Sequence, residues 1–305
     1  MKRAPLFILG TILLVLFAVG AVQVYANKKA EEKVEELFER FGLEEKSTYR
    51  EVNYSLLSGT VEVSGLNLVT DEGSSHIDRL VIKKLTDTDI EVYAFGMRGE
   101  DKDFRKLEEQ LRALGYDDVR MNTYVSLSLY EDTKELLVRK VGVEVPGAFR
   151  TEVSFKLTGI DREFINDLKG LEGEGDDREK VARIANRLKR VYLNELSLKL
   201  TDPGFMNRLL EKEARDKKKS VEELKRDILR GIENSIAEDS SEFEKTLVEG
   251  VSRLIEHGGT LVLEARPREP VSFENLVLYT LMALQTRDFS HFVKELNLKV
   301  KYQEV

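Results

Sequence analysis

Residues 119–157 read VRMNTYVSLSLYEDTKELLVRKVGVEVPGAFRTEVSFKL, and this stretch decides the predicted fold. Apolar and polar residues alternate in three segments, residues 119–130, 136–145 and 148–157. Such alternation is typical of half-buried strands. Turn-forming residues separate the segments, EDTK at residues 131–134 and Pro-Gly at residues 146–147. We therefore predict three antiparallel strands connected by hairpins.

A short pattern within this stretch recurs along the chain. SFKLTGID at residues 154–161 is followed by a helix start, and SLKLTD at residues 197–202 is followed by another. A weaker copy, ELNLKV, occupies residues 295–300. Repeated strand-then-helix units must stack their apolar faces on neighbours, which implies one shared sheet with helices packed on a face. Chance alternation of Leu with Ser and Lys is the alternative explanation.

The segments on either side of the three strands differ in kind. Before them, alternation and turn residues predict further strands; after them, three- and four-residue apolar spacing predicts mostly helices. The earlier strands are expected at residues 49–56, 60–69, 77–85 and 90–95, with one helix at residues 103–114. The later helices are expected at residues 177–191, 203–215, 220–236, 241–257, 272–284 and 288–296, with short strands at residues 193–200, 260–265 and 297–302.

Several of these helix starts carry capping residues. Asp202 precedes a proline, a pair that suits the cap and first turn of a helix. Ser220 with Glu223, and Ser241 with Glu244, have the spacing of capping boxes, in which side-chain and backbone groups bond reciprocally. These residues predict where three of the helices begin.

The N-terminal segment is apolar and uncharged over residues 6–22, with Lys2 and Arg3 before it and Lys28 after it. About 20 apolar residues cross a hydrocarbon core of about 30 Å, so we predict a transmembrane helix with its N-terminus inside. A cleaved signal peptide is the alternative. The residues expected to form the anchor are Leu6, Phe7, Ile8, Leu9, Ile12, Leu13, Leu14, Val15, Leu16, Phe17, Val19 and Val22.

The predicted fold class is α+β: an N-terminal transmembrane helix, then antiparallel sheet with helices packed on one face and strand–helix repeats toward the C-terminus. In the second of four regions, an apolar stripe is formed by Val34, Leu37, Phe38 and Phe41. Such a stripe needs cover, either from the domain itself or by pairing of two copies, and because it is short for a coiled coil we expect it to dock against the first strands. The regions are a cytoplasmic tip and anchor (residues 1–27), an amphipathic stalk helix (28–46), a β-rich subdomain (47–168) and a helix-rich α+β subdomain (178–305).

Charge and missing residue types exclude several classes of function. With 48 Lys and Arg against 56 Asp and Glu, the chain has a net charge of −8, so nucleic acid is not an expected ligand. It contains no cysteine, which excludes disulfides and zinc–thiolate sites. His76, His257 and His291 lack the i,i+4 spacing of a helical metal pair. The nucleotide-binding and nucleophile motifs are absent, and we expect no cofactor.

One acidic pattern is a weak candidate metal site. Asp87, Asp89 and Glu91 alternate, so on a strand all three would point to one face and could hold a hard cation through oxygen ligands. A solvated strand edge explains the same pattern. These residues are therefore alternatives for metal binding or carboxylate chemistry.

Two stretches resemble single-pass periplasmic proteins of Gram-negative envelopes. VNYSLLSGTVEVSGLNL at residues 52–68, after the anchor, looks like the opening strands of AsmA-like and YdgA-like proteins. LSLKLTDPGF at residues 196–205, with GGTLVLEARPREPV at residues 258–271, is similar to YdgA-like chains. The resemblance implies an inner-membrane protein whose bulk lies in the periplasm and, for AsmA-like members, lipid movement along a β-lined groove. The chain departs from AsmA-like proteins in being short and rich in long helices.

The leading functional prediction is a non-enzymatic, membrane-anchored envelope protein that binds a protein or lipid partner in addition to the bilayer. It follows by elimination, since no catalytic constellation is present. One alternative is carriage of a lipid or hydrophobic ligand. It is motivated by residues 273–284, where apolar side chains surround the predicted helix and need cover on every side. The cover would come from burial in the core, or else the helix would line a pocket or touch the membrane. The other alternative is an enzyme that uses the carboxylates at residues 87, 89 and 91.

Overall fold

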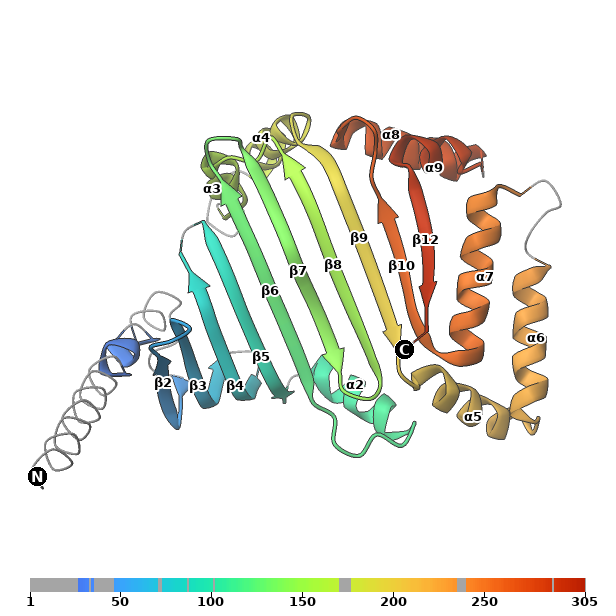
Figure 1. Cartoon of the computed structure of the whole chain (residues 1–305), viewed down its shortest axis with the longest axis horizontal. Coiled ribbons are helices and arrows are strands. Elements are labelled where there is room, and N and C mark those ends of the chain that lie inside the picture. Colours follow the sequence, from blue (N-terminus) through green and yellow to red (C-terminus); the bar gives the residue numbers. More distant parts are fainter. Residues whose placement is uncertain are drawn as a thin grey trace, which may run out of the picture. The chain divides into compact units, whose positions relative to one another are not determined.

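The computed structural model describes residues 27–32, 34–35, 47–70, 73–86, 88–100, 102–169, 177–234, 240–286 and 288–304. Twelve strands, mostly antiparallel, are present in these ranges together with helices (Figure 1). The chain forms two compact units. The first comprises Met1–Leu85, Glu91–Glu109 and Arg120–Asn122, and the second comprises Thr86–Ile90, Gln110–Val119 and Thr123–Val305.

The first unit is built on antiparallel strands. Two short strands pair with the same long strand, β3, which pairs on its other side with β4, and β4 neighbours β5. The core of the unit lies under these strands and includes Val63, Leu66 and Ile77. The elements are β1 (Ser47–Thr48), β2 (Glu51–Ser55), β3 (Thr60–Thr70), β4 (Gly73–Leu85), β5 (Asp89–Gly99) and α2 (Lys102–Arg112).

The predicted stalk helix meets the first strands where the structure describes it. Val34 is 2% exposed and belongs to the same buried cluster as Val52 and Val63. The side chain of Asn27 accepts a hydrogen bond from the backbone N–H of Tyr54 at 2.8 Å. Docking against the first strands is therefore confirmed for Val34. The rest of the predicted stripe, Leu37, Phe38 and Phe41, lies outside the described residues.

The second unit contains the predicted three-strand segment. Its strands are ordered β6-β7-β8-β9-β10-β12, and β11 pairs with the N-terminal end of β9. The bounds of the first three agree with the alternation in the sequence, because that pattern reports which residues face the core. The strands are β6 (Met121–Tyr130), β7 (Glu135–Val145), β8 (Phe149–Thr158), β9 (Tyr192–Asp202), β10 (Gly259–Ala265), β11 (Val271–Ser272) and β12 (Leu298–Gln303).

The recurring sequence pattern corresponds to strands that are neighbours in this unit. β8 and β9 pair antiparallel, with Ser154 opposite Ser197 and Phe155 opposite Leu196. β10 joins the other side of β9, and β12 pairs with β10. Strands from both sides of the predicted boundary at residues 169–177 therefore share one sheet.

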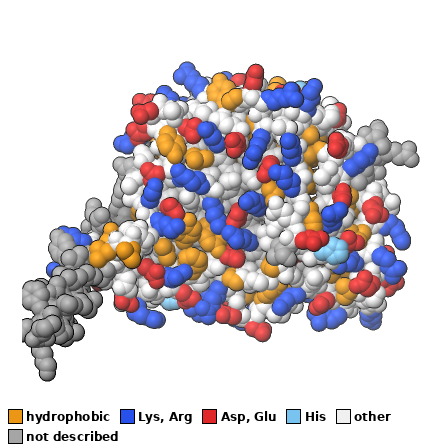
Figure 2. Space-filling view, viewed as in Figure 1, with side chains coloured by type: hydrophobic (Ala, Val, Ile, Leu, Met, Phe, Trp, Pro, Cys, Tyr) orange, Lys and Arg blue, Asp and Glu red, His pale blue; other side chains and the backbone are white. Residues whose placement is uncertain are grey.

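The two faces of this sheet differ in chemistry. Register places Val141, Val153, Leu198, Leu263 and Val300 in one row across five strands. Because side chains alternate between faces, the residues one position along lie on the opposite face, where charged groups predominate. Ion pairs there join Lys140 to Glu152, Lys156 to Glu135 and Lys301 to Glu264. Figure 2 shows basic and acidic side chains interspersed in this way.

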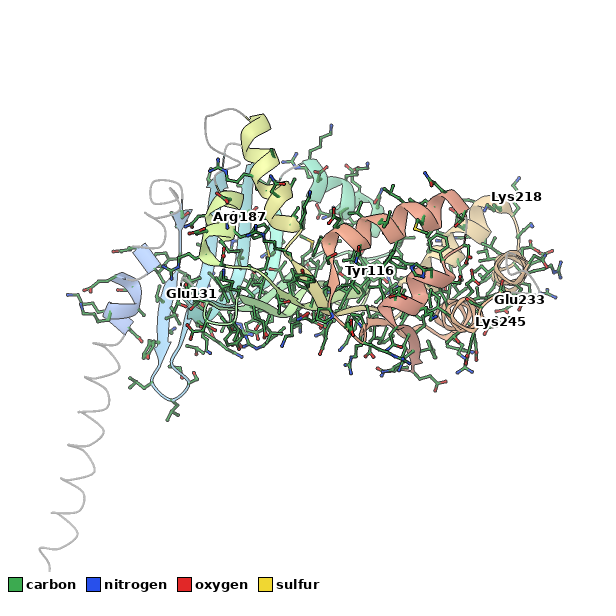
Figure 3. All side chains as sticks on the ribbon, turned by 90° about the horizontal axis from the view of Figure 1, so that it is seen from above. Tyr116, Glu131, Arg187, Lys218, Glu233 and Lys245 are labelled. Carbon is green, nitrogen blue, oxygen red and sulfur yellow. The ribbon has the colours of Figure 1, made fainter. Side chains whose placement is uncertain are left out.

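Helices of the second unit form two groups. Residues of α3, α4, α8 and α9 share a buried cluster with Leu157, Leu193 and Leu296, and in Figure 3 α3, α4 and α8 lie on the same side of the strands. Helices α5, α6 and α7 form a second cluster, and α7 lies beside the edge strand β12 (Figure 1). The helices are α3 (Arg162–Lys169), α4 (Asp177–Leu188), α5 (Phe205–Lys217), α6 (Val221–Glu233), α7 (Glu242–His257), α8 (Phe273–Thr286) and α9 (Ser290–Leu296).

The helix starts agree with the capping residues. Ser241 and Glu244 form the complete capping box at α7, and Ser220 accepts a hydrogen bond from the backbone N–H of Glu223 at α6. Asp202 accepts from the backbone N–H groups of Gly204, Phe205 and Met206 at the start of α5, which begins at Phe205, two residues after the predicted Pro203. Capping is a local interaction, which is why it could be predicted from sequence spacing.

The predicted fold class and membrane localisation need correction. In the part of the chain that the structure describes, no helix is both long and apolar enough to cross a bilayer. The single-pass, inner-membrane protein with a periplasmic bulk is therefore not supported. The anchor residues Leu6, Phe7, Ile8, Leu9, Ile12, Leu13, Leu14, Val15, Leu16, Phe17, Val19 and Val22 lie outside the described residues. In place of the predicted architecture the described residues form a mostly antiparallel sheet with helices, in which β9, β10 and β12 extend the sheet of β6–β8.

Candidate functional site

Helix α8 has two apolar sides, and only one of them is covered. Phe273, Leu276 and Tyr279 pack against the buried cluster of the second unit, and Ala283 is 2% exposed. These residues recur at three- and four-residue spacing, so they form one stripe along the helix. The side chain of Tyr279 also packs edge-on against the ring of His291 in α9, with ring centroids 4.8 Å apart. This stripe fixes α8 to the unit.

The opposite side of α8 is apolar and exposed. The exposed fractions are 57% for Val277, 50% for Leu278, 52% for Leu281, 45% for Met282 and 63% for Leu284. We call these five residues the outer face of α8. Their spacing is that of a helix stripe, because residues 277, 281 and 284 follow one another at intervals of four and three. An apolar helix surface of this kind is the arrangement expected of a contact site.

The sequence predicted that this helix would need cover on every side. Burial in the core, which was one expectation, applies only to the inner stripe. The residues of the outer face are as apolar as those of the inner stripe. They are exposed because no other described element packs on them. Composition alone indicated a helix that is apolar all round, and the tertiary structure identifies which side lacks a neighbour.

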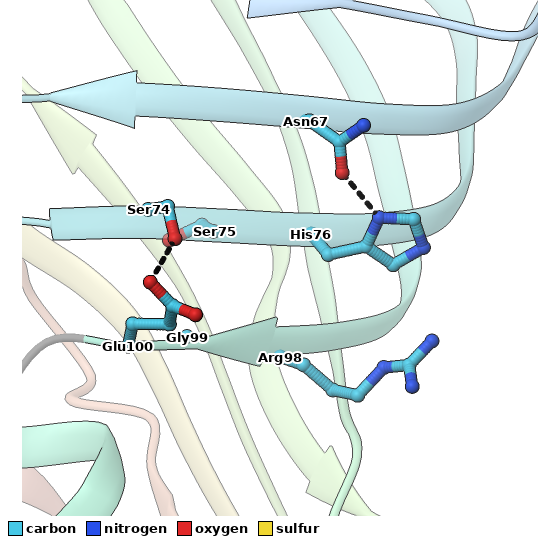
Figure 4. Close-up of a pocket in the computed structure, with 7 residues that line it drawn as sticks. All are labelled: Asn67, Ser74, Ser75, His76, Arg98, Gly99 and Glu100. Carbon is cyan, nitrogen blue, oxygen red and sulfur yellow. Dashed lines mark hydrogen bonds between the residues drawn. The ribbon is translucent and has the colours of Figure 1, made fainter.

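A shallow polar pocket of about 440 Å³ lies on the first unit (Figure 4). Asn67 contributes its side-chain oxygen to the Nδ1 of His76 at 2.6 Å. The hydroxyl of Ser74 donates to Glu100 at 2.5 Å. Arg98 points away from that pair in Figure 4. The pocket therefore holds two separate polar contacts, Asn67 with His76 and Ser74 with Glu100.

Asp78 organises the charges beside this pocket. Its carboxylate contacts Arg98 at 2.9 Å, Arg120 at 2.7 Å and the Nε2 of His76 at 3.2 Å. Burial by itself would raise the pKa of Asp78, but the hydrogen bond from Arg98 and the charges of Arg98, Arg120 and His76 outweigh it and hold the pKa below its usual range. The carboxylate joins strands that are distant in sequence, which is a structural role.

Replacing Asp78 with asparagine is expected to lower the free energy of unfolding at neutral pH and to have much less effect in acid. The folded-state pKa of this carboxyl is depressed. Its stabilisation is therefore present above the unfolded pKa of about 4 and is lost as the pH falls through the folded pKa. Urea unfolding of wild type and Asp78→Asn at pH 7, 5 and 3 measures the difference.

Asp132→Asn, in the exposed turn after β6, is the control for this pH series. For this variant we do not expect the difference in free energy of unfolding from wild type to become smaller between pH 7 and pH 3. If the difference between wild type and Asp78→Asn stayed the same at pH 3 as at pH 7, the ionised carboxylate would not be the source of the stabilisation.

The acidic residues predicted as a metal site are occupied by protein groups. Asp89 accepts a hydrogen bond from the hydroxyl of Ser128, which is 2% exposed and also accepts from Arg139 at 2.8 Å. Glu91 contacts Lys83 at 2.9 Å and accepts from the hydroxyl of Tyr93, and these two hydrogen bonds lower its pKa. Within the described ranges, no group of three or more His, Asp or Glu side chains could hold a metal ion.

Asp87, the third predicted ligand, lies outside the described residues. Metal or carboxylate chemistry at Asp87, Asp89 and Glu91 therefore stays a prediction. The structure adds a competing role for two of them, because Asp89 and Glu91 each satisfy buried or half-buried polar partners.

A further charged cluster ties two helices together. Arg187 of α4, labelled in Figure 3, contacts Asp161, Glu163 and Asp167, which lie at the start of α3 and within it. The carboxylate of Asp161 accepts from the backbone N–H of Phe164, and this hydrogen bond is the main reason that its pKa is lowered. The cluster caps α3 and fixes its packing against α4.

Sequence reasoning missed the residues at the centre of these networks, Asp78, Arg120, Ser128 and Arg187. Each of them appears as an ordinary polar residue on a strand or helix. Their partners lie far away in the chain, for example 42 residues from Asp78 to Arg120 and 39 from Asp89 to Ser128. No local spacing could have identified them.

Comparison with known proteins gives two matches. A family model described as "Uncharacterized protein" matches residues 142–303. A protein of Aquifex aeolicus (strain VF5), also described as an uncharacterized protein, is 26% identical over 302 residues, covering 97% of this chain and 98% of that protein. Neither match supports the resemblance to YdgA-like or AsmA-like proteins. The family match runs from the end of β7 to the end of β12 and includes α8.

Proposed function

We propose, from the premise that the chain belongs to the family of uncharacterized proteins whose model matches its residues 142–303, that this is a binding protein without enzymatic activity. Its partner is a protein, and the contact surface is the outer face of α8. This surface lies within the segment by which the family is recognised.

The observation that carries the proposal is the exposure of five large apolar side chains along one helix. Full burial of such a side chain contributes about 1.5–3 kcal/mol, so covering five half-exposed ones contributes several kcal/mol. Large continuous apolar patches on a protein surface usually mark a place where something binds. A partner that presents its own apolar helix would fit a stripe with this spacing.

The charge around α8 favours a protein over a membrane surface. Helices that lie on membranes usually carry Lys and Arg on their polar side. Between Phe273 and Thr286 there is no Lys or Arg, and the single charged residue is Glu274. The whole chain has a net charge of −8, which anionic lipid would repel. An apolar protein surface does not require Lys or Arg on α8, and it does not repel a negatively charged chain.

A photo-reactive amino acid in place of Leu281 tests the proposal in the cells that produce the protein. We expect irradiation to give a covalent adduct with a polypeptide, because position 281 lies in the middle of the outer face. Mass spectrometry of the purified adduct identifies what was bound. The matched control carries the same photo-reactive residue in place of Glu222, which is exposed on α6.

The control position is expected to give no such adduct. The proposal would be wrong if position 281 gave no polypeptide adduct, or gave the same adducts as position 222. Adding Val277→Ser and Leu284→Ser to the Leu281 probe is expected to abolish the adduct, since these changes remove apolar area from the same stripe without adding charge.

A second candidate function is carriage of a lipid or other hydrophobic ligand. It is favoured by the apolar rows of the second unit's sheet, where Val141 and Leu198 are 38% exposed and Leu200 is 40% exposed. A flat apolar surface of this type could hold an acyl chain. The same photo-reactive residue in place of Leu198 separates the two functions, because carriage requires a lipid adduct at that position.

A further inference from the structure

The outer face of α8 is shaped for another helix. Residues 277 and 281 form one ridge at an interval of four, and residues 278 and 282 form a second, parallel ridge. Side chains in such rows pack into the grooves between the rows of a second helix. Phe289, the residue before α9, is a further exposed apolar side chain close by in the sequence, with an exposed fraction of 42%.

The outer face is also free of charge. From Asn275 to Thr286 the sequence is NLVLYTLMALQT, without Asp, Glu, Lys, Arg or His. In a two-fold symmetric contact each residue near the axis meets its own counterpart, so any charged side chain there faces a like charge. An uncharged stripe avoids this repulsion. Two copies of a chain with a net charge of −8 can therefore approach one another most readily at this surface.

We infer that the partner at the outer face of α8 is a second copy of this chain, paired through antiparallel α8 helices. This inference rests on the proposed function, since it names the protein that occupies the same surface. The antiparallel direction brings the N-terminus of each helix near the C-terminus of the other, which is the favourable arrangement of helix dipoles. The stripe from Val277 to Leu284 has Leu281 close to its midpoint, so Leu281 lies near the two-fold axis.

The area of the surface places the dimer among small interfaces. The five residues of the outer face and Phe289 are each roughly half exposed. Even a large aromatic side chain buries no more than about 250 Å², so six half-exposed ones supply less than the roughly 800 Å² per partner of a standard interface. We therefore expect a reversible dimer with a Kd on the order of micromolar.

Sedimentation velocity of the purified full chain, over a range of concentrations, tests this inference. Wild type is expected to shift from monomer to dimer as concentration rises. Leu281→Glu is expected to weaken the dimer about tenfold or more, because it places two carboxylates near the axis in an apolar contact. Leu57→Glu is the matched control: Leu57 is fully exposed on the hairpin between β2 and β3, and the same change there is expected to leave the dimer unchanged.

Mixing two variants gives a test that a folding defect cannot imitate. Leu281→Glu and Leu281→Lys alone are each expected to dimerise about tenfold or more weakly than wild type, because like charges meet at the axis. An equimolar mixture of the two is expected to recover association, since opposite charges then face one another. Circular dichroism of each variant checks that α8 has kept its helical structure.

Three results separate this inference from the proposed function. If wild type is monomeric at all concentrations but the photo-reactive residue at position 281 labels another polypeptide, the second copy is wrong and the binding function stands. If it labels this same chain, both stand. If neither self-association nor a polypeptide adduct is found, both are wrong. Dimerisation of Leu281→Glu equal to that of wild type would also overturn the inference.

Discussion

Replacing Gly159 with alanine is expected to lower the free energy of unfolding by roughly 2–5 kcal/mol, through backbone strain and a steric clash together. Gly159 has a φ of +87°, and a Cβ added there would lie 1.9 Å from the carbonyl oxygen of Arg190. That oxygen belongs to the backbone that leads into β9, so it cannot rotate away as a side chain would. Urea unfolding of wild type and Gly159→Ala measures the loss.

Gly147→Ala is the matched control for this substitution. Gly147 has a similar φ of +74°, but a Cβ at this position has no atom within 4 Å. It should therefore show only the cost of the left-handed backbone, about 1–2 kcal/mol. If the two variants lost the same amount of stability, the approach of Arg190 to Gly159 would contribute nothing, and backbone conformation alone would explain the effect.

Replacing Asp202 with alanine is expected to lower the free energy of unfolding by about 2–4 kcal/mol, because it removes a buried carboxylate that caps a helix and leaves three half-buried N–H donors without their acceptor. Asp202 is 4% exposed. Its carboxylate accepts from the backbone N–H groups of Gly204 at 2.8 Å, Phe205 at 2.6 Å and Met206 at 3.1 Å. Thermal and urea unfolding of the variant measure the effect.

Two further variants separate the cap from the burial of Asp202. Asp202→Asn keeps one acceptor oxygen, and the bonds from Gly204 and Phe205 both go to the same oxygen, so its loss should be smaller than that of alanine. Ser220→Ala removes an exposed cap from α6 and is expected to cost about 1 kcal/mol. Should Asp202→Ala cost no more than Ser220→Ala, the burial of the Asp202 carboxylate would add nothing to the cost of the lost cap.

The sequence predicted the apolar residues of the candidate contact surface but not which side of the helix is exposed. The apolar residues of α8 were identified as needing cover, but their pattern surrounds the helix almost completely. The inner stripe of Leu276, Tyr279 and Ala283 and the outer face differ only in which side meets α9 and the strands. That choice depends on the direction in which α8 leaves β11, which local spacing does not report.

Strand partners were likewise beyond local reasoning. The resemblance between residues 154–157 and 197–200 suggested strands in one sheet, and β8 and β9 are indeed neighbours. The sequence placed a boundary between them at residues 169–177, because that segment is rich in glycine and acid. The pairing of Ser154 with Ser197 across that segment involves residues 43 positions apart, and no composition of the connecting chain forbids it.

The sequence by itself determined the strands β6, β7 and β8, the starts of α6 and α7, and the need to cover Val34 and α8. These features depend on side-chain alternation, helix spacing and capping, which act over a few residues. Only the tertiary structure decided the order and register of β9, β10 and β12 in the sheet, the joining of distant elements by Asp78 and Arg187, and the exposure of the outer face of α8. The physical reason is that pairing and exposure depend on partners far away in the chain, whose positions exist only once the fold has brought them together.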